Sequence, residues 1–160
     1  MLFNFFPPSE QITNTGVKNL CYGLNFTQSL SSLTLVFQLC KSINDEGAKE
    51  LSCITKLKSL KALDLNFYAC TKITNKGFES LASSFSSLKL LKELKLDFGI
   101  CDKICYKGIQ RLCLSLVDMD KISTIKWNFK GCFKVTDKKI KEYLLELKLK
   151  SLKTENIILG

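Results

Sequence analysis

The chain has 160 residues, 46% of them hydrophobic, and a formal net charge of +9. This length predicts a single domain, residues 1–160. Histidine is absent, which excludes Ser-His-Asp and Cys-His catalytic sites and HExxH zinc sites. The longest apolar run, residues 1–8, is too short for a signal peptide or a spanning helix. We therefore expect an intracellular protein, cytoplasmic and without a membrane span, that is not an enzyme and uses no cofactor or small-molecule substrate.

Landmark residues recur along the chain at steps of 30 or 31. A repeat of this period is typical of a solenoid. Within the unit at residues 60–88, Leu63, Leu65 and Phe67 alternate with polar neighbours, which predicts a half-buried strand. After Gly77 the apolar positions are spaced by three and four residues, which predicts an amphipathic helix. The recurring landmarks are the cysteines Cys40, Cys70, Cys101 and Cys132 and the glycines Gly16, Gly47, Gly77 and Gly108.

In chain order, the units are predicted at about 2–29, 30–59, 60–90, 91–121 and 122–151, with a terminal strand at 152–160. A step of 31 aligns Leu33 with Leu2 in the first unit, so we expect the repeats to start within two residues of Met1. The bend and helix of that unit are predicted over residues 12–24, and the second helix continues through Leu51. The fifth unit has Lys139 where glycine is expected, a helix at 140–149, and a last strand that includes Ile157 and Leu159.

These units resemble the leucine-rich repeat family, in its ribonuclease-inhibitor-like, cysteine-containing branch. Units of 30–31 residues are also similar to the long units of ciliate leucine-rich repeat proteins. The resemblance implies an α/β solenoid shaped as a horseshoe, with parallel strands on the concave face and helices on the convex face, and a role in partner binding. The matching residues of the third unit are Leu60, Leu63, Leu65, Cys70, Ile73, Thr74, Asn75 and Gly77.

The strand residues that alternate with the core are the candidate binding site. A helix needs about 10 Å laterally and a paired strand about 4.8 Å, so stacked units bend the sheet and hollow the strand face. The polar residues between the core positions then line this hollow in columns of mixed charge, amides and one aromatic, which suits a protein partner. The candidates are Thr34, Val36, Gln38, Asp64, Asn66, Tyr68, Lys95, Asp97, Lys126, Asn128 and Lys130.

The eight cysteines are interpreted as structural thiols. The Cβ vectors of adjacent landmark cysteines run parallel, whereas a disulfide requires converging ones. The chain has no CxxC pair and no histidine, which disfavours a zinc site. We therefore expect neither a disulfide nor a metal.

The function predicted from these features is a non-catalytic protein-interaction or scaffold module. We expect it to bind through the concave face and the open ends of the array, as a subunit of a larger complex. One alternative is a substrate-recruiting subunit of a ubiquitin ligase. A third is a nucleic-acid-associated protein, which the net charge of +9 permits. That charge comes almost wholly from lysine and Arg111 is the single arginine, which argues against phosphate readout.

Overall fold

The computed structural model describes residues 1–4, 11–132, 135, 138, 140, 142–143 and 157–158. Strands and helices alternate along the chain, as the switch between period two and period 3.6 predicts. The first half comprises β1 (Leu2–Asn4), α1 (Asn14–Leu24), β2 (Ser32–Val36), α2 (Asp45–Glu50), the 3₁₀ helix η1 (Leu51–Lys56) and β3 (Ala62–Asn66). The second half comprises α3 (Asn75–Phe85), β4 (Glu93–Asp97), α4 (Tyr106–Leu116), β5 (Thr124–Asn128) and β6 (Ile157–Ile158).

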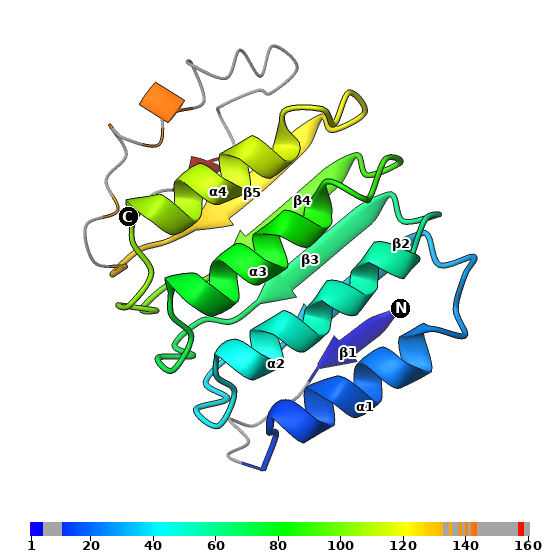
Figure 1. Cartoon of the computed structure of the whole chain (residues 1–160), viewed down its shortest axis with the longest axis horizontal. Helices are drawn as coiled ribbons and strands as arrows, with labels where there is room; N and C mark the ends of the chain where they lie inside the picture. Colours follow the sequence, from blue (N-terminus) through cyan, green and yellow to red (C-terminus); the bar gives the residue numbers. More distant parts are fainter. Residues whose placement is uncertain are drawn as a thin grey trace.

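The strands form one parallel sheet in the order β1-β2-β3-β4-β5-β6. Helices α1 to α4 lie side by side over one face of this sheet (Figure 1). The core fills the layer between them, because Leu63 and Leu65 of β3 and the apolar face of α3 are buried together. Through the core runs a column of rings, with Phe67 stacked between Phe37 and Phe98 at centroid distances of 5.0 and 5.2 Å. In the described part of the chain, no helix is both long and apolar enough to cross a membrane.

The predicted leucine-rich repeat solenoid is corrected, and only its α/β class stands. The described residues form an open sheet with one layer of helices. The structural likeness given below supports the α/β class and does not support a ribonuclease-inhibitor-like horseshoe. The prediction derived the curvature from a full-width helix behind every strand. In the second unit the α-helix ends at Glu50 and gives way to η1, and a 3₁₀ helix is wound more tightly than an α-helix. The width mismatch that should bend the sheet is therefore not uniform along it.

Three of the recurring glycines, Gly47, Gly77 and Gly108, make room for a residue of the preceding unit. A Cβ on Gly77 would lie 2.7 Å from Cα of Asp45, and one on Gly47 would lie 2.6 Å from Oδ1 of Asn14. Asp45 uses this space to accept hydrogen bonds from Thr74, at 2.7 Å from its backbone nitrogen and 2.8 Å from its hydroxyl. Thr74 in turn caps α3 by accepting from the backbone nitrogen of Lys76. Each bend is therefore fastened to the one before it.

One predicted detail is wrong, and a second needs refinement. Strand β1 pairs Leu2 with Thr34, one residue away from the alignment with Leu33 that a uniform step of 31 gives. The connection from β1 to α1 is one residue longer than that from β2 to α2, and a one-residue slip exchanges the two faces of a strand. The second helix does continue through Leu51, but its α-helical part ends at Glu50 and the chain goes on as the 3₁₀ helix η1 to Lys56.

The predictions for the end of the chain are only partly covered by the described residues. Ile157 does lie in a last strand, β6. Lys139, Leu159 and most of the helix predicted at 140–149 fall outside the described residues. Within the predicted helix, Ile140 is described and is buried in the core.

Candidate functional site

The strand register brings the predicted site residues together on the sheet face that the four helices leave uncovered. We call this surface the open face. Its first row is Thr34, Asp64, Lys95 and Lys126, and its second row is Val36, Asn66, Asp97 and Asn128. A third row, just beyond the strands, is Gln38, Tyr68, Gly99 and Lys130. Lys126 and Lys130 are exposed, and the other predicted residues are half-buried. That these rows bind a partner stays a prediction.

The first row carries a charge cluster centred on Lys95. Its Nζ lies 3.1 Å from Oε1 of Glu93, an acidic residue outside the predicted site that stands two positions before Lys95 on the same face. Asp64 lies opposite Lys95 in the register. Burial raises the pKa of the Asp64 carboxyl, Lys95 opposes that shift, and Glu93 and Asp97 add to it. The centre of the open face is therefore a place where acidic and basic groups offset each other.

The second row is organised mainly by bonds to its own backbone. The side-chain oxygens of Asn66, Asp97 and Asn128 each accept a hydrogen bond from the backbone nitrogen two residues later, at 2.9, 3.0 and 3.0 Å. The Asn128 amide also donates to Oδ1 of Asp97 at 3.0 Å. Such short-range bonds fix the turn after each strand. These side chains are consequently held in fixed positions, with part of their bonding capacity already used.

The third row presents a tyrosine against a glycine. A Cβ on Gly99 would lie 2.8 Å from Cδ2 of the Tyr68 ring and 3.1 Å from Nδ2 of Asn128. The ring of Tyr68 therefore lies against Gly99 of the next unit. An aromatic side chain held in place before binding loses little rotamer entropy in a complex, and tyrosine is enriched among residues that dominate binding energy.

A small hollow lies within the open face. Its volume is about 180 Å³, and it is lined by Asp64, Asn66, Lys95, Leu96, Asp97, Lys126, Trp127 and Asn128. Pockets for drug-sized ligands usually have volumes of about 300–1,000 Å³. Among the described residues, no group of histidine, cysteine or acidic side chains is arranged to hold a metal ion. The arrangement is that of a broad contact surface.

The landmark cysteines do not reach this surface. The thiol of Cys70 donates to the carbonyl oxygen of Phe37 at 3.1 Å, and Cys101 and Cys132 bond in the same way to Phe67 and Phe98, at 3.3 and 3.1 Å. Burial, with a contribution from Cys40, raises the pKa of Cys70 to about 12. The thiols of Cys70, Cys101 and Cys132 are buried and not disulfide-bonded, and they link each bend to the preceding unit as hydrogen-bond donors.

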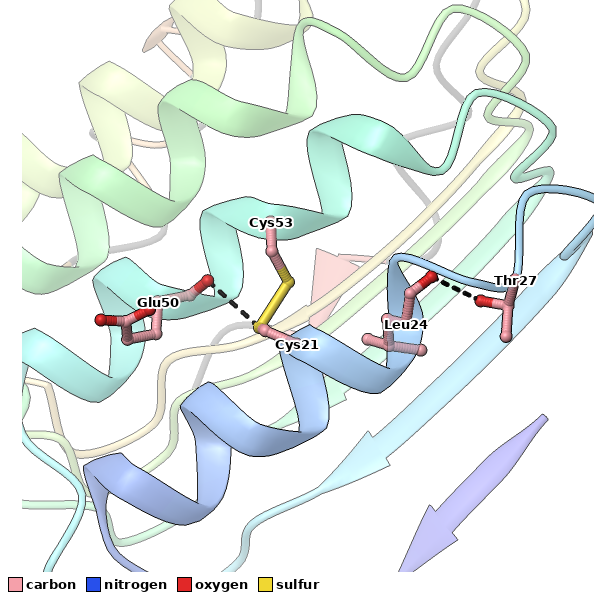
Figure 2. Close-up of a disulfide and its surroundings, with 5 residues drawn as sticks. All are labelled: Cys21, Leu24, Thr27, Glu50 and Cys53. Carbon is pink, nitrogen blue, oxygen red and sulfur yellow. Dashed lines mark hydrogen bonds between the residues drawn. A yellow bond between two sulfur atoms is a disulfide. The ribbon is translucent and has the colours of Figure 1, made fainter.

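The expectation of no disulfide is wrong for one pair. Cys21 on α1 and Cys53 on η1 are bridged, with their Cα atoms 5.9 Å apart (Figure 2). Parallel Cβ vectors disfavour a bridge only between equivalent positions of successive units. These two residues are 32 apart in sequence, one more than the usual step, and they lie on neighbouring helices whose side chains converge.

Comparison with solved structures shows a likeness of fold. No family model matches the chain, and no curated protein matches it. The family resemblance therefore stays a prediction from the sequence. Among solved structures, the chain is similar to leiomodin-1 actin-binding site 2, with a TM-score of 0.61 and 17% sequence identity over 91% of this chain and 77% of that chain. That neighbour is not of the ribonuclease-inhibitor-like branch, so what the likeness shows is an α/β fold of this kind.

Proposed function

We propose that this chain is a non-catalytic protein-binding module whose open face receives the partner, within a larger assembly. The observation that carries the proposal is the open face itself, three aligned rows of half-exposed polar side chains across β2–β5 with Tyr68 held against Gly99. The name of the similar structure, an actin-binding site, supports a protein partner and makes actin the first one to test.

The charges of the open face support a protein partner over nucleic acid. Binding to a phosphate backbone needs uncompensated cations, whereas here Lys95 is paired with Glu93 and flanked by Asp64 and Asp97. A protein surface can complement such alternating charges, which set register and suppress wrong partners. The hollow of about 180 Å³ then accommodates one protruding side chain.

The test compares two tyrosines on opposite sides of the molecule. Tyr68→Ala removes the aromatic group of the open face, whereas Tyr22→Ala removes an exposed aromatic residue from helix α1. Each variant is first checked for unchanged circular dichroism and then titrated against purified actin by biolayer interferometry. We expect the Tyr68 variant to bind about 30-fold more weakly or worse, a loss of at least about 2 kcal/mol, and the Tyr22 variant to bind as the wild type does.

Three results would count against the proposal. Binding that is equally strong in both variants would mean that the partner contacts another surface. If actin does not bind, the same pair of variants is used as bait in cell extract, and identical sets of captured proteins would refute a role for the open face. Tight binding to mixed RNA that persists at raised salt would favour the nucleic-acid alternative.

A further inference from the structure

The Cys21–Cys53 bridge joins the first two units on the helix side, away from the open face. Cys21 lies in the second half of α1, and Cys53 lies within η1 directly across from it (Figure 2). The two helical segments are neighbours in the helix layer (Figure 1). The bridge is therefore a covalent clamp between the unit that contains β1 and α1 and the rest of the sheet.

The two sulfur-bearing residues differ in access. Cys21 is 5% exposed and belongs to the core. Cys53 is half-buried and lines a groove of about 680 Å³ between α1 and the α2–η1 segment. Cys21 is not among the residues that line this groove. A small molecule in the groove thus meets the sulfur of Cys53 first.

The charge of the groove selects among such molecules. Three lysines, Lys18, Lys49 and Lys56, line it together with Glu46 and Glu50. The amide of Asn14 donates a hydrogen bond to Oε2 of Glu46 at 3.3 Å, so one oxygen of that carboxylate already has a partner. The remaining balance is positive, so an anionic thiol is attracted more than a cationic one.

The sulfur that opening of the bridge would release, Sγ of Cys21, already lies next to a hydrogen-bond acceptor. Sγ of Cys21 lies 3.2 Å from the carbonyl oxygen of Glu50 (Figure 2). A disulfide sulfur carries no hydrogen, so this contact becomes a hydrogen bond only when Cys21 is a thiol. Cys70 makes the same kind of thiol-to-carbonyl bond in the core, so a reduced Cys21 has its polar hydrogen satisfied without rearrangement.

We propose that Cys53 is a site of thiol–disulfide exchange with a small anionic thiol of the glutathione class. The thiolate attacks Sγ of Cys53, forming a mixed disulfide there while the bond to Cys21 breaks. Cys21 leaves as a thiolate, takes a proton and donates to the Glu50 carbonyl. A second thiolate attacks the small-molecule sulfur of the mixed disulfide and releases Cys53, so two thiols are oxidised to one disulfide as the bridge is reduced. The reverse sequence, with the small disulfide as oxidant, closes the clamp.

The test uses single-cysteine variants and oxidised glutathione. Cys21→Ser leaves Cys53 alone in the groove, and Cys53→Ser leaves Cys21 alone in the core. After incubation, intact mass and peptide mapping locate the adduct, so modification of the half-buried Cys105 is read separately. We expect Cys53 to be modified at least about tenfold faster than Cys21, because exposure governs thiol access. Equal rates, or modification of Cys21 alone, would overturn the proposal.

Two further measurements keep the proposal testable if a variant folds poorly. Wild-type protein treated with reduced glutathione and trapped with iodoacetamide should carry glutathione on Cys53 and the alkyl group on Cys21, and the opposite pattern would refute the assignment. Lys56→Glu should lower the rate of bridge opening by glutathione relative to the cationic thiol cysteamine by about threefold. An unchanged ratio would show that the lysines of the groove do not select the thiol.

Discussion

Substitution of Gly77 by alanine tests how the units are joined, because the glycine leaves room for Asp45 of the preceding unit. A Cβ at this position would lie 2.7 Å from Cα of Asp45 and 2.5 Å from its Oδ1. A contact with backbone this short cannot be relieved by turning a flexible side chain. Either the two units move apart, or Asp45 gives up its hydrogen bonds to Thr74.

The magnitude follows from three terms. Overpacking of this kind costs about 1–3 kcal/mol. Loss of one hydrogen bond to the Asp45 carboxylate costs about 1.5–3 kcal/mol. Replacing glycine by alanine in a helix by itself stabilises the helix by about 1 kcal/mol, which offsets part of this cost. We therefore expect Gly77→Ala to lower the free energy of unfolding by about 2 kcal/mol or more, which corresponds to a fall in Tm of roughly 4–8 °C for a chain of this length.

The matched control is Gly23→Ala, in which the same change is made on another helix. Gly23 lies in α1, and a Cβ there would have no neighbour within 4 Å. We expect this variant to be slightly more stable than the wild type. Urea unfolding followed by circular dichroism compares both variants, and Asp45→Ala completes a double-mutant cycle with Gly77→Ala. If Gly77→Ala is as stable as the control, the explanation of the recurring glycines is wrong. A smaller cost in the Asp45→Ala background measures the share that comes from the lost hydrogen bonds to Thr74.

Three further changes probe the bridge, the thiols and the ring column. Reduction of the Cys21–Cys53 bridge, which closes a loop between residues 32 apart, should lower the free energy of unfolding by roughly 3–4 kcal/mol in urea titrations, and an unchanged urea midpoint would contradict this. Because burial raises the pKa of Cys70 from 9.0 to about 12, the unfolded chain loses this proton first, and stability should fall by about 1.4 kcal/mol per pH unit between those values. Cys70→Ala should flatten the pH dependence by that amount, and an identical alkaline slope would refute the argument. Phe67→Ala, in the fully buried ring column, should cost about 3–5 kcal/mol, whereas Phe26→Ala, at 74% exposure, should stay within about 0.5 kcal/mol, and similar costs for both would contradict the packing.

The sequence by itself determined the elements and most of their alignment. Alternation of Leu63, Leu65 and Phe67 with polar residues predicted β3 and its buried face, because a strand has period two and one face must be covered. The constant step placed Asp64 opposite Lys95, as the register of β3 and β4 has it. A regular repeat allows such long-range pairings to be predicted from the sequence, since each unit contacts the next one in the same way.

The predicted rows of the open face follow from the same regularity, but their internal bonding does not. The Tyr68 ring over Gly99 and the bond from Asn128 to Asp97 depend on side chains from different units. A glycine at that position in the sequence says only that a side chain is missing. It does not say which neighbour fills the space.

Only the tertiary structure decided the features that depart from the repeat. The pairing of Leu2 with Thr34 depends on one extra residue in a connection. The Cys21–Cys53 bridge depends on the convergence of two helices. Leu39, Ala69 and Ile100 adopt positive φ of 63°, 59° and 61°, where glycine would be expected. The backbone N–H of each of these residues donates a hydrogen bond to a carbonyl oxygen of the next unit, at 2.7–2.8 Å. The equivalent residue of the fifth unit is Gly131, also at positive φ, so in the three earlier units the left-handed conformation accompanies bonds between units and is not signalled by a glycine.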